Sequence, residues 1–322
     1  MKTAKRSPVV VGSSLAEGSD EVVARALALA RASHLPLTVV HAFEPASPAF
    51  APFPTAEVVA DPRWMDRLSE ALTSRLEDQG RRLGIGAADG ETRLILDTAE
   101  RALTTCAADT RAALIVVGES TRARALRLLG TTADRLVRRS PCPVLVTHPG
   151  SAFPPRTVLI PVDLSDLSGG ALRAGLSMIR QAGWTPEWVE VLFALDPAER
   201  TGSLQFSPEQ VERFAADELE RFLANYGDAA GVNLRRHVLT AEPREGLLER
   251  IAELGPDLVV VGTHGRRGLD RLLLGSVATA VLAHAETNVL VVPPEAASAH
   301  LASSQEGPDW QYVSDENHST AA

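Results

Sequence analysis

The sequence contains an internal repeat whose copies lie about 145 residues apart. Four segments recur in the same order in both halves: Val9–Val11 and Val158–Ile160, Leu114–Gly118 and Leu258–Gly262, Gly130–Thr131 and Gly275–Ser276, Val144–Val146 and Val289–Val291. Repeats of solenoid proteins are only roughly 20–50 residues long. The longer period therefore indicates two copies of a whole domain in tandem, and 322 residues suffice for each copy to bury its own core.

Each half alternates short β-branched runs with longer patterns of helical spacing. Strands are predicted at 8–11, 37–42, 92–96, 114–117 and 143–146, and again at 157–162, 187–195, 234–239, 258–261 and 288–292. Continuous apolar strands that alternate with helices predict a parallel sheet covered on both faces. The predicted fold class is therefore α/β, with two tandem, doubly wound, five-stranded parallel-sheet domains.

The predicted helices lie between these strands. They span about 20–33, 62–83, 99–109, 131–139, 168–181, 208–226 and 244–254, and a further helix starts near Ser276. The segment Ser207-Pro208-Glu209-Gln210 predicts a capping box with proline at the first helical position.

Composition marks the boundaries of the two domains. Prolines and small residues at 149–156 predict a linker between a first domain at 1–148 and a second at 157–294. Beyond this point the chain turns to Ala, Ser and acidic residues, with no Lys or Arg from 296 to 322. We therefore predict a disordered tail over 295–322.

The overall composition argues against several classes of partner and site. A net charge of −9 argues against nucleic acid, because phosphate contacts need clustered Lys and Arg. No run approaches the roughly 18 apolar residues of a membrane span. Two cysteines, Cys106 and Cys142, provide neither a disulfide framework nor four zinc ligands, and they favour a reducing, cytoplasmic location. The histidines match no metal-binding spacing, so no metal site of the protein's own is predicted.

A glycine-rich segment follows the predicted strand 258–261. Gly262 and Gly265 lie in the loop that leaves the strand, and Gly275-Ser276 opens the next predicted helix. Ligands of open parallel sheets bind outside the carboxyl ends of the strands. Glycines let backbone amides approach a ligand, and a helix start offers unpaired amides and a favourable dipole. The segment suits an anion cradle for nucleotide phosphates, with Ser276 as helix cap or phosphate contact. It suits a purely structural turn equally well.

Asp163 lies at the carboxyl end of the second half's first strand, in the segment IPVDLSD. A carboxylate in this position suits hydrogen bonds from ribose hydroxyls. The alternative is an aspartate that only shapes a turn or a helix entry. The sequence contains no P-loop, dinucleotide fingerprint or nucleophile elbow, so no catalytic residue is predicted.

The second half, about 157–293, resembles a universal stress protein domain of the ATP-binding type. Gly262, Gly265, Gly275 and Ser276 match the signature G-x2-G-x9-G-[ST] without a gap. The segments IPVDLSD, DLVVVGTHGR and GSVATAVLAHAETNVLVV are also typical of that family. The resemblance implies an adenine-nucleotide α-hydrolase-like fold that binds ATP, with magnesium or manganese accompanying the phosphates.

The resemblance also implies a role for each residue of the expected site. Asp163 would contact the ribose, Pro161 would lie beside the base, and Ala194 would meet adenine through its backbone. The phosphates would be held by Gly262, Gly265, Arg266, Gly275, Ser276 and Val277.

The first half, about 8–147, resembles a divergent copy of the same domain. Ser14 stands where Asp163 does, Thr121 replaces the second glycine, and Gly130 lies one residue too close for the signature. We therefore expect a structural role for this half, with the two domains paired inside one chain as domains of this family pair. Further association of two chains into a homodimer through exposed edge strands stays open.

The leading functional hypothesis is a stress-response regulator that binds ATP and reports the binding to a protein partner. A cradle without a general base or nucleophile suits sensing better than turnover. Two alternatives stay open. One is a slow ATPase or autophosphorylating protein with Ser276 or a nearby hydroxyl as acceptor, and the other is a nucleotide-free protein whose domains only dimerise.

Overall fold

The computed structural model describes residues 6–44, 63–119, 132–196, 207–227, 231–263 and 274–302. Its first half contains β1 (Val9–Gly12), α1 (Ser19–Ala32), β2 (Leu37–Ala42), α3 (Trp64–Arg82), β3 (Gly90–Ile95), α4 (Ala99–Thr110), β4 (Leu114–Gly118), α6 (Thr132–Arg139) and β5 (Val144–Thr147). The second half contains β6 (Thr157–Val162), α7 (Asp166–Gln181), β7 (Trp188–Leu195), α9 (Pro208–Tyr226), β8 (Leu234–Thr240), α10 (Pro243–Leu254), β9 (Leu258–Gly262), α11 (Ser276–His284), β10 (Asn288–Val292) and α12 (Pro294–Ala302).

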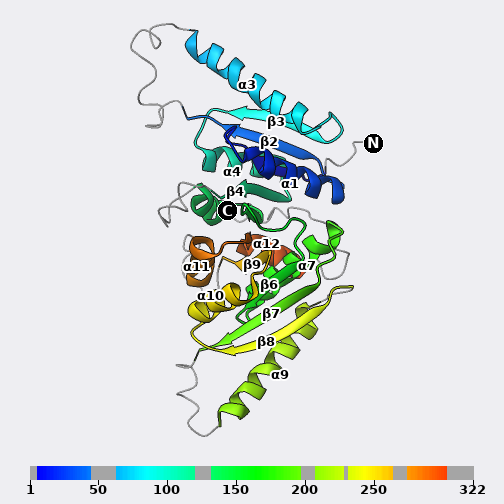
Figure 1. The fold of residues 1–322 in the computed structure, drawn as a ribbon, viewed down its shortest axis with the longest axis vertical. Helices are drawn as coiled ribbons and strands as arrows, with labels where there is room; N and C mark the ends of the chain where they lie inside the picture. Colours follow the sequence, from blue (N-terminus) through cyan, green and yellow to red (C-terminus); the bar gives the residue numbers. More distant parts are fainter. Residues whose placement is uncertain are drawn as a thin grey trace, which may run out of the picture.

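The ten strands of the described residues form one sheet, in the order β3-β2-β1-β4-β5-β10-β9-β6-β7-β8 (Figure 1). Neighbouring strands within each half are parallel. The halves meet where β5 and β10 pair antiparallel, with Leu145 opposite Leu290. The predicted fold class is confirmed, and its two five-stranded sheets join edge to edge within the chain.

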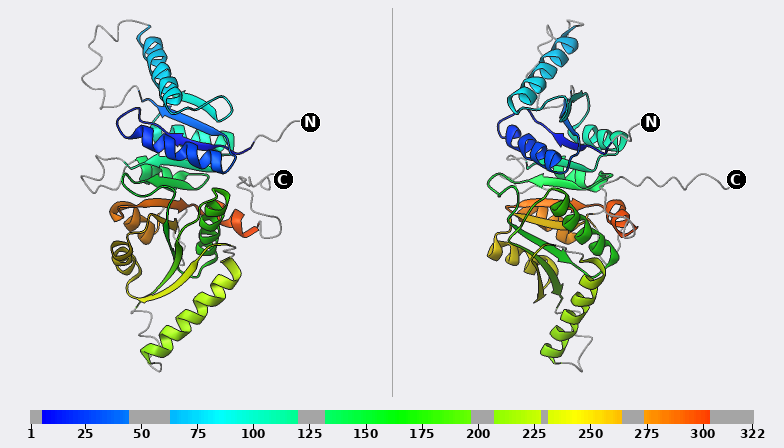
Figure 2. Two further views of the ribbon diagram at one scale, coloured as in Figure 1. Left: turned by 45° about the vertical axis from the view of Figure 1, so that its right-hand side comes forward. Right: turned by 90° about the vertical axis from the view of Figure 1, so that its right-hand side faces the viewer.

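Helices cover both faces of this sheet (Figure 2). One apolar core lies under α1, α3, α7, α9 and α12, and the other lies under α4, α6, α10 and α11. Successive strand residues alternate between the two cores, so that Val158 and Ile160 face the first and Leu159 faces the second. Because both faces are buried, the strands are uninterrupted apolar runs rather than alternating ones.

Two helices of the second half test predictions made from the sequence. Ser207 caps α9 through the predicted capping box, because its Oγ accepts from Gln210 N at 3.3 Å and its N–H donates to Gln210 Oε1 at 2.8 Å. After the last strand, Pro294–Ala302 forms α12, which packs on α7 and buries Ala297. Disorder over 295–322 is therefore wrong for 295–302. Residues 303–322 lie outside the described residues.

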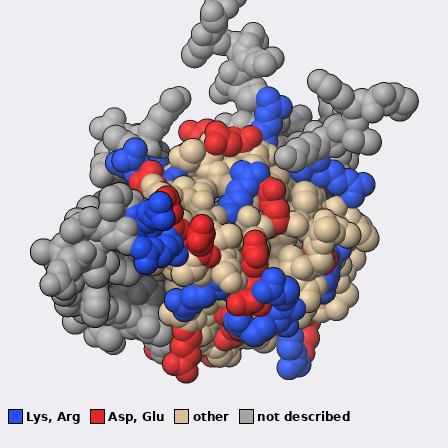
Figure 3. Space-filling view, turned by 90° about the horizontal axis from the view of Figure 1, so that it is seen from above, with Lys and Arg blue, Asp and Glu red and all other residues tan. Residues whose placement is uncertain are grey.

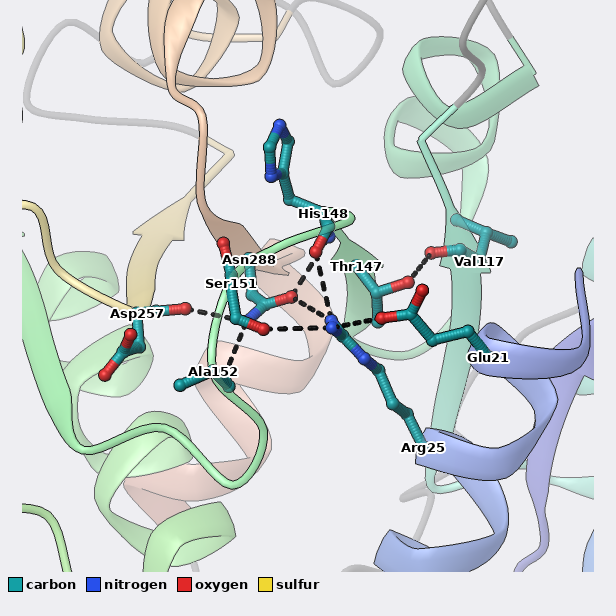
Figure 4. Close-up of polar contacts among 9 residues, drawn as sticks. All are labelled: Glu21, Arg25, Val117, Thr147, His148, Ser151, Ala152, Asp257 and Asn288. Carbon is teal, nitrogen blue, oxygen red and sulfur yellow. Dashed lines mark hydrogen bonds and ion pairs between the residues drawn. The ribbon is translucent and has the colours of Figure 1, made fainter. Parts of the chain in front are cut away.

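Asn288, at the start of β10, joins the two halves and the linker between them (Figure 4). Its side chain is buried and makes four hydrogen bonds. Oδ1 accepts from Arg25 Nη1 and from the backbone N–H of His148, both at 3.0 Å. Nδ2 donates to the carbonyl oxygens of Ala152 and Asp257, at 3.2 and 2.7 Å. One amide therefore links β10 to α1, to the end of β5 and to the linker.

Arg25 of α1 reinforces this junction from the first half. Its guanidinium donates to the carbonyl oxygens of His148 and Ser151, at 3.1 and 2.9 Å, and pairs with Glu21 on the same helix. It also lies 5.6 Å above the ring of Phe153. These contacts hold the linker against α1 as it leaves β5.

The end of the molecule formed by α3 and β3 carries interspersed basic and acidic side chains (Figure 3). Arg82 pairs with Asp20 at 3.0 Å, and Arg81 pairs with Asp78. The described residues of this face therefore offer a polyanion no continuous basic surface. Among the described residues, no helix is long and apolar enough to cross a bilayer.

Candidate functional site

The strand order of the second half reverses between β6 and β9, and the predicted site lies at the carboxyl ends of these strands. α7 follows β6 and covers one face of the sheet, whereas α11, the next described helix after β9, covers the other. Connections that leave to opposite faces open a crevice at the strand ends. The β6–β9 ladder pairs Val158 with Leu258 and Leu159 with Val259. Pro161, further along β6, has no N–H to extend it.

Asp163 follows β6 in a tight turn that starts α7. Its Oδ1 accepts from Ser165 N at 3.0 Å and from Ser165 Oγ at 2.6 Å. Ser165 in turn caps α7 by accepting from Ser168 N, and Leu164 between them has a φ of 63°. The half-buried Asp163 thus serves the helix entry, as the structural alternative predicts. The same hydrogen bonds fix its carboxylate at the edge of the crevice.

α11 begins without a side-chain cap. Gly275 occupies the N-cap position, and Ser276, which is exposed, is the first helical residue. The first intrahelical hydrogen bond runs from Thr279 N to Gly275 O at 2.9 Å. The amides of Ser276 and Val277 precede that bond, and the helix offers them no acceptor. Ser276 therefore does not act as the helix cap, which was one of its predicted roles.

Thr263 holds the start of α11 against the end of β9. Its carbonyl accepts from Gly275 N at 2.7 Å, and its own N–H donates to Val292 O at 3.1 Å. A Cβ added to Gly275 would stand 3.2 Å from that Thr263 oxygen, closer than side chains normally approach. Close backbone packing thus favours glycine here, and glycine places no side chain of its own at the start of the helix.

Two further predicted residues lie at the same edge of the sheet. Pro161 is the next-to-last residue of β6, and Ala194 is the next-to-last residue of β7; both are half-buried. The structure thus brings Pro161, Asp163, Ala194, Gly262, Gly275, Ser276 and Val277 to the carboxyl ends of β6, β7 and β9. Gly265 and Arg266 lie outside the described residues.

The first half places different side chains at the corresponding positions. Val9 pairs with Leu114 in β4 as Val158 pairs with Leu258 in β9, so Ser14 corresponds to Asp163. Ser14 is exposed, and its Oγ accepts from Ala16 N at 3.3 Å. Position 14 of the first half therefore lacks the carboxylate that Asp163 provides in the second half.

Glu119 is the first-half counterpart of Thr263, because each is the residue that directly follows its strand. Its Oε2 lies 3.4 Å from Nε2 of the buried His148, which follows β5. The repeat of Leu114–Gly118 and Leu258–Gly262 also aligns Glu119 with Thr263, whereas its contact with His148 is visible only in the structure. A carboxylate at this point disfavours a phosphate group on electrostatic grounds.

A buried polar network also distinguishes the first half. Gln79 of α3 accepts from Ser13 Oγ at 2.7 Å and donates to Ser19 Oγ at 3.0 Å and Asp20 Oδ1 at 2.7 Å. It ties α3 to the loop after β1. A cavity of about 400 Å³ lies beside this network, away from the crevice of the second half. Paired charges, such as Asp20 with Arg82, line it.

The sequence and fold resemble those of universal stress proteins. A model of the universal stress protein family matches residues 5–148 and 155–293. Universal stress protein Rv2005c of Mycobacterium tuberculosis is 30% identical over 314 residues, which cover 90% of this chain and 98% of that protein. A universal stress protein of Mycolicibacterium smegmatis is 28% identical over 304 residues, with coverage of 91% and 99%.

Solved structures resemble this fold over most of the chain. A universal stress protein from Archaeoglobus fulgidus aligns with a TM-score of 0.63 at 14% identity, covering 89% of this chain and 98% of that one. Protein PA1789 from Pseudomonas aeruginosa aligns with a TM-score of 0.60 at 21% identity, with coverage of 94% and 98%. At these identities the likeness concerns the fold alone.

Proposed function

The chain belongs to the universal stress protein family, and from this premise we propose that its C-terminal half binds ATP and acts as a stress-response regulator. The observation that carries the proposal is the uncapped start of α11, which lies at the same sheet edge as the Asp163 turn. An anion-binding helix start and a ribose-binding carboxylate are the two elements that a nucleotide site at a strand-order reversal needs.

The phosphate side of the proposed site is built mainly from backbone. The amides of Ser276 and Val277, which have no acceptor within the helix, and the dipole of α11 favour an anion at this point. Gly275 keeps the approach open, because it has no side chain between the helix start and Thr263. Gly262 begins the loop, and Gly265 and Arg266 remain predicted contacts. Magnesium or manganese would be held chiefly by phosphate oxygens.

The nucleoside side is formed by β6 and β7. Asp163, oriented by two hydrogen bonds from Ser165, would accept hydrogen bonds from ribose hydroxyls. Pro161 would lie beside the base, and the backbone of Ala194 would meet adenine. All three positions lie at the carboxyl ends of neighbouring strands, which is where this class of sheet binds ligands.

A regulator is favoured over an enzyme by the chemistry of the described residues. The described part of the site presents no side chain in the position of a general base. Slow autophosphorylation is the alternative that one observation favours, because the Ser276 hydroxyl is exposed and not used for capping. Incubation with γ-labelled ATP separates the two. Stable label that a Ser276→Ala variant loses would support the alternative, and unlabelled protein that binds ATP would support regulation.

A cytoplasmic location and a protein partner belong to the same proposal. Cys106 and Cys142 are both free and buried, and burial raises the pKa of the Cys142 thiol to about 12. Unpaired, unreactive thiols suit a reducing compartment. The ATP-bound form would be the one that the partner recognises, and a homodimer would form through the outer strands β3 and β8.

Titration calorimetry with ATP tests the binding site, with variants matched between the halves. Asp163→Asn keeps an oxygen to accept from Ser165 but loses the charge, and should weaken binding about 10- to 100-fold. Ser14→Ala changes the corresponding first-half position and should leave the affinity unchanged. Absence of ATP binding by the unaltered chain, or equal losses in both variants, would contradict the proposal.

A further inference from the structure

Two adjacent glycines lie inside the first turns of α7. Gly169 and Gly170 are both buried, and glycine inside a helix weakens it relative to alanine. α1 has Val22 and Val23 at the same two places after its own start. A helix that gives up favourable residues at two successive positions needs a reason in its packing.

The glycines let two other helices approach the backbone of α7. A Cβ on Gly170 would stand 2.3 Å from the carbonyl oxygen of Ala297 in α12. A Cβ on Gly169 would stand 2.7 Å from the ring of Tyr226 in α9. Both distances are too short for real side chains, so α7 begins between α9 and α12 in direct contact with each. In the first half, a linker rather than a helix follows β5, and α1 keeps its valines.

Polar contacts fix the same end of α7. Tyr226 Oη donates to Asp166 Oδ1 at 2.7 Å. Arg173 lies 5.1 Å above the Tyr226 ring and donates to the carbonyl oxygens of Asn225 in α9 and His300 in α12. Arg173 therefore bridges all three helices one turn beyond the glycines.

The start of α7 is also the turn that presents Asp163. Ser165 caps α7 and donates twice to the Asp163 carboxylate, and Ser168 Oγ accepts from Asp163 N. Whatever holds the first turn of α7 therefore holds Asp163. We propose that α12 is the positioning element for Asp163, so that the chain segment after the last strand sets the affinity for a ribose-bearing ligand. This inference rests on the proposed function.

Two C-terminal truncations test it. A chain that ends at Ala302 loses only residues 303–322 and serves as control, whereas a chain that ends at Pro293 also loses α12. Removal of α12 should speed hydrogen exchange of the amides of 163–170 about tenfold or more, with exchange of β1 and β2 unchanged. It should also reduce the preference for ATP over an analogue without ribose hydroxyls by about fivefold or more. A general loss of protein stability would weaken the binding of both ligands alike and would not change that preference.

Gly170→Ala provides a second variant that keeps the full chain. The added methyl group must move α12 away. In the full chain, this variant should therefore show both the faster exchange and the reduced ligand preference. In the chain that ends at Pro293, which has no α12, the same substitution should add nothing to either effect. Unchanged exchange at 163–170 and an unchanged ligand preference in both variants would overturn the inference. If the unaltered chain binds no nucleotide, the proposed function fails, and hydrogen exchange alone then decides whether α12 holds the Asp163 turn.

Discussion

The two halves share one framework and differ at the carboxyl ends of their strands. Both have five parallel strands in the same order, and β1 and β4 pair in the register of β6 and β9. At the edge, the first half has Ser14 and Glu119 where the second has Asp163 and Thr263. Burial on both faces constrains the strands, whereas the edge is constrained only by what it binds. The comparison therefore separates what the fold needs from what the proposed nucleotide site needs.

In the first half, the residues that follow the strands make contacts within the protein. Gln79 joins α3 to the loop after β1, and Glu119 lies against the buried His148. A phosphate beside the Glu119 carboxylate would meet a like charge. In the described part of the second half, no side chain caps the start of α11 at the carboxyl ends of the strands.

The largest expected effect comes from the junction between the two halves at Asn288. Asn288→Ala leaves the N–H of His148 and the carbonyl oxygens of Ala152 and Asp257 without their partner. We expect it to lower the free energy of unfolding by about 2–4 kcal/mol. Urea unfolding measures this, with Asn233→Ala as control, because exposed Asn233 makes one hydrogen bond to Glu187 O. Equal losses in the two variants would mean that the junction contributes little.

The next effect sharpens the contrast between the two edges. Gly275→Val adds a branched side chain where even a Cβ approaches Thr263 O to 3.2 Å, and it obstructs the start of α11. ATP affinity should fall about 100-fold, or roughly 2.7 kcal/mol. Gly130→Val, at the first-half counterpart by sequence, should leave the affinity unchanged in the same calorimetric titration. A comparable loss from Gly130→Val would place nucleotide binding in the wrong half.

The smallest expected effect is a loss of protein stability at acid pH that arises from Asp89 in the first half. Arg31, with help from the Gly86 amide, lowers the pKa of Asp89 from 3.8 to about 2. Because the folded pKa lies below the unfolded one, the contact stabilises the protein above pH 3.8 and is lost as the pH falls towards 2. Asp89→Asn should flatten the pH dependence of unfolding between pH 4 and 2. Arg31→Gln should flatten it to a smaller extent, because the Gly86 N–H still donates to Asp89, and an undiminished slope in both variants would refute the assignment.

Much of the fold could be predicted because the strands carry a strong local signal. Leu37–Ala42, Thr157–Val162 and Asn288–Val292 were predicted with the observed bounds, because strands buried on both faces are continuous apolar runs. α12 was missed because an Ala- and Ser-rich segment shows little apolar periodicity. Its packing depends on the small size of Gly170 and Ala297, which no pattern along the chain reveals.

The predicted site depended on a motif along the chain, whereas the junction between the halves depends on long-range contacts. Gly275 and Asp163 could be found from spacing, because a helix start and a strand end each have local signatures. Asn288 could not, because its partners Arg25 and His148 lie 263 and 140 residues away in sequence. The contact of Glu119 with His148 likewise could not be predicted, because no local pattern relates the two residues.

The number of ATP molecules bound per chain tests the contrast between the halves most directly. Titration calorimetry of the unaltered chain should give one site, which Asp163→Asn weakens and which a Ser14→Ala variant retains. Two equivalent sites would show that Ser14 and Glu119 do not prevent nucleotide binding in the first half. No site at all would remove the role assigned to the start of α11.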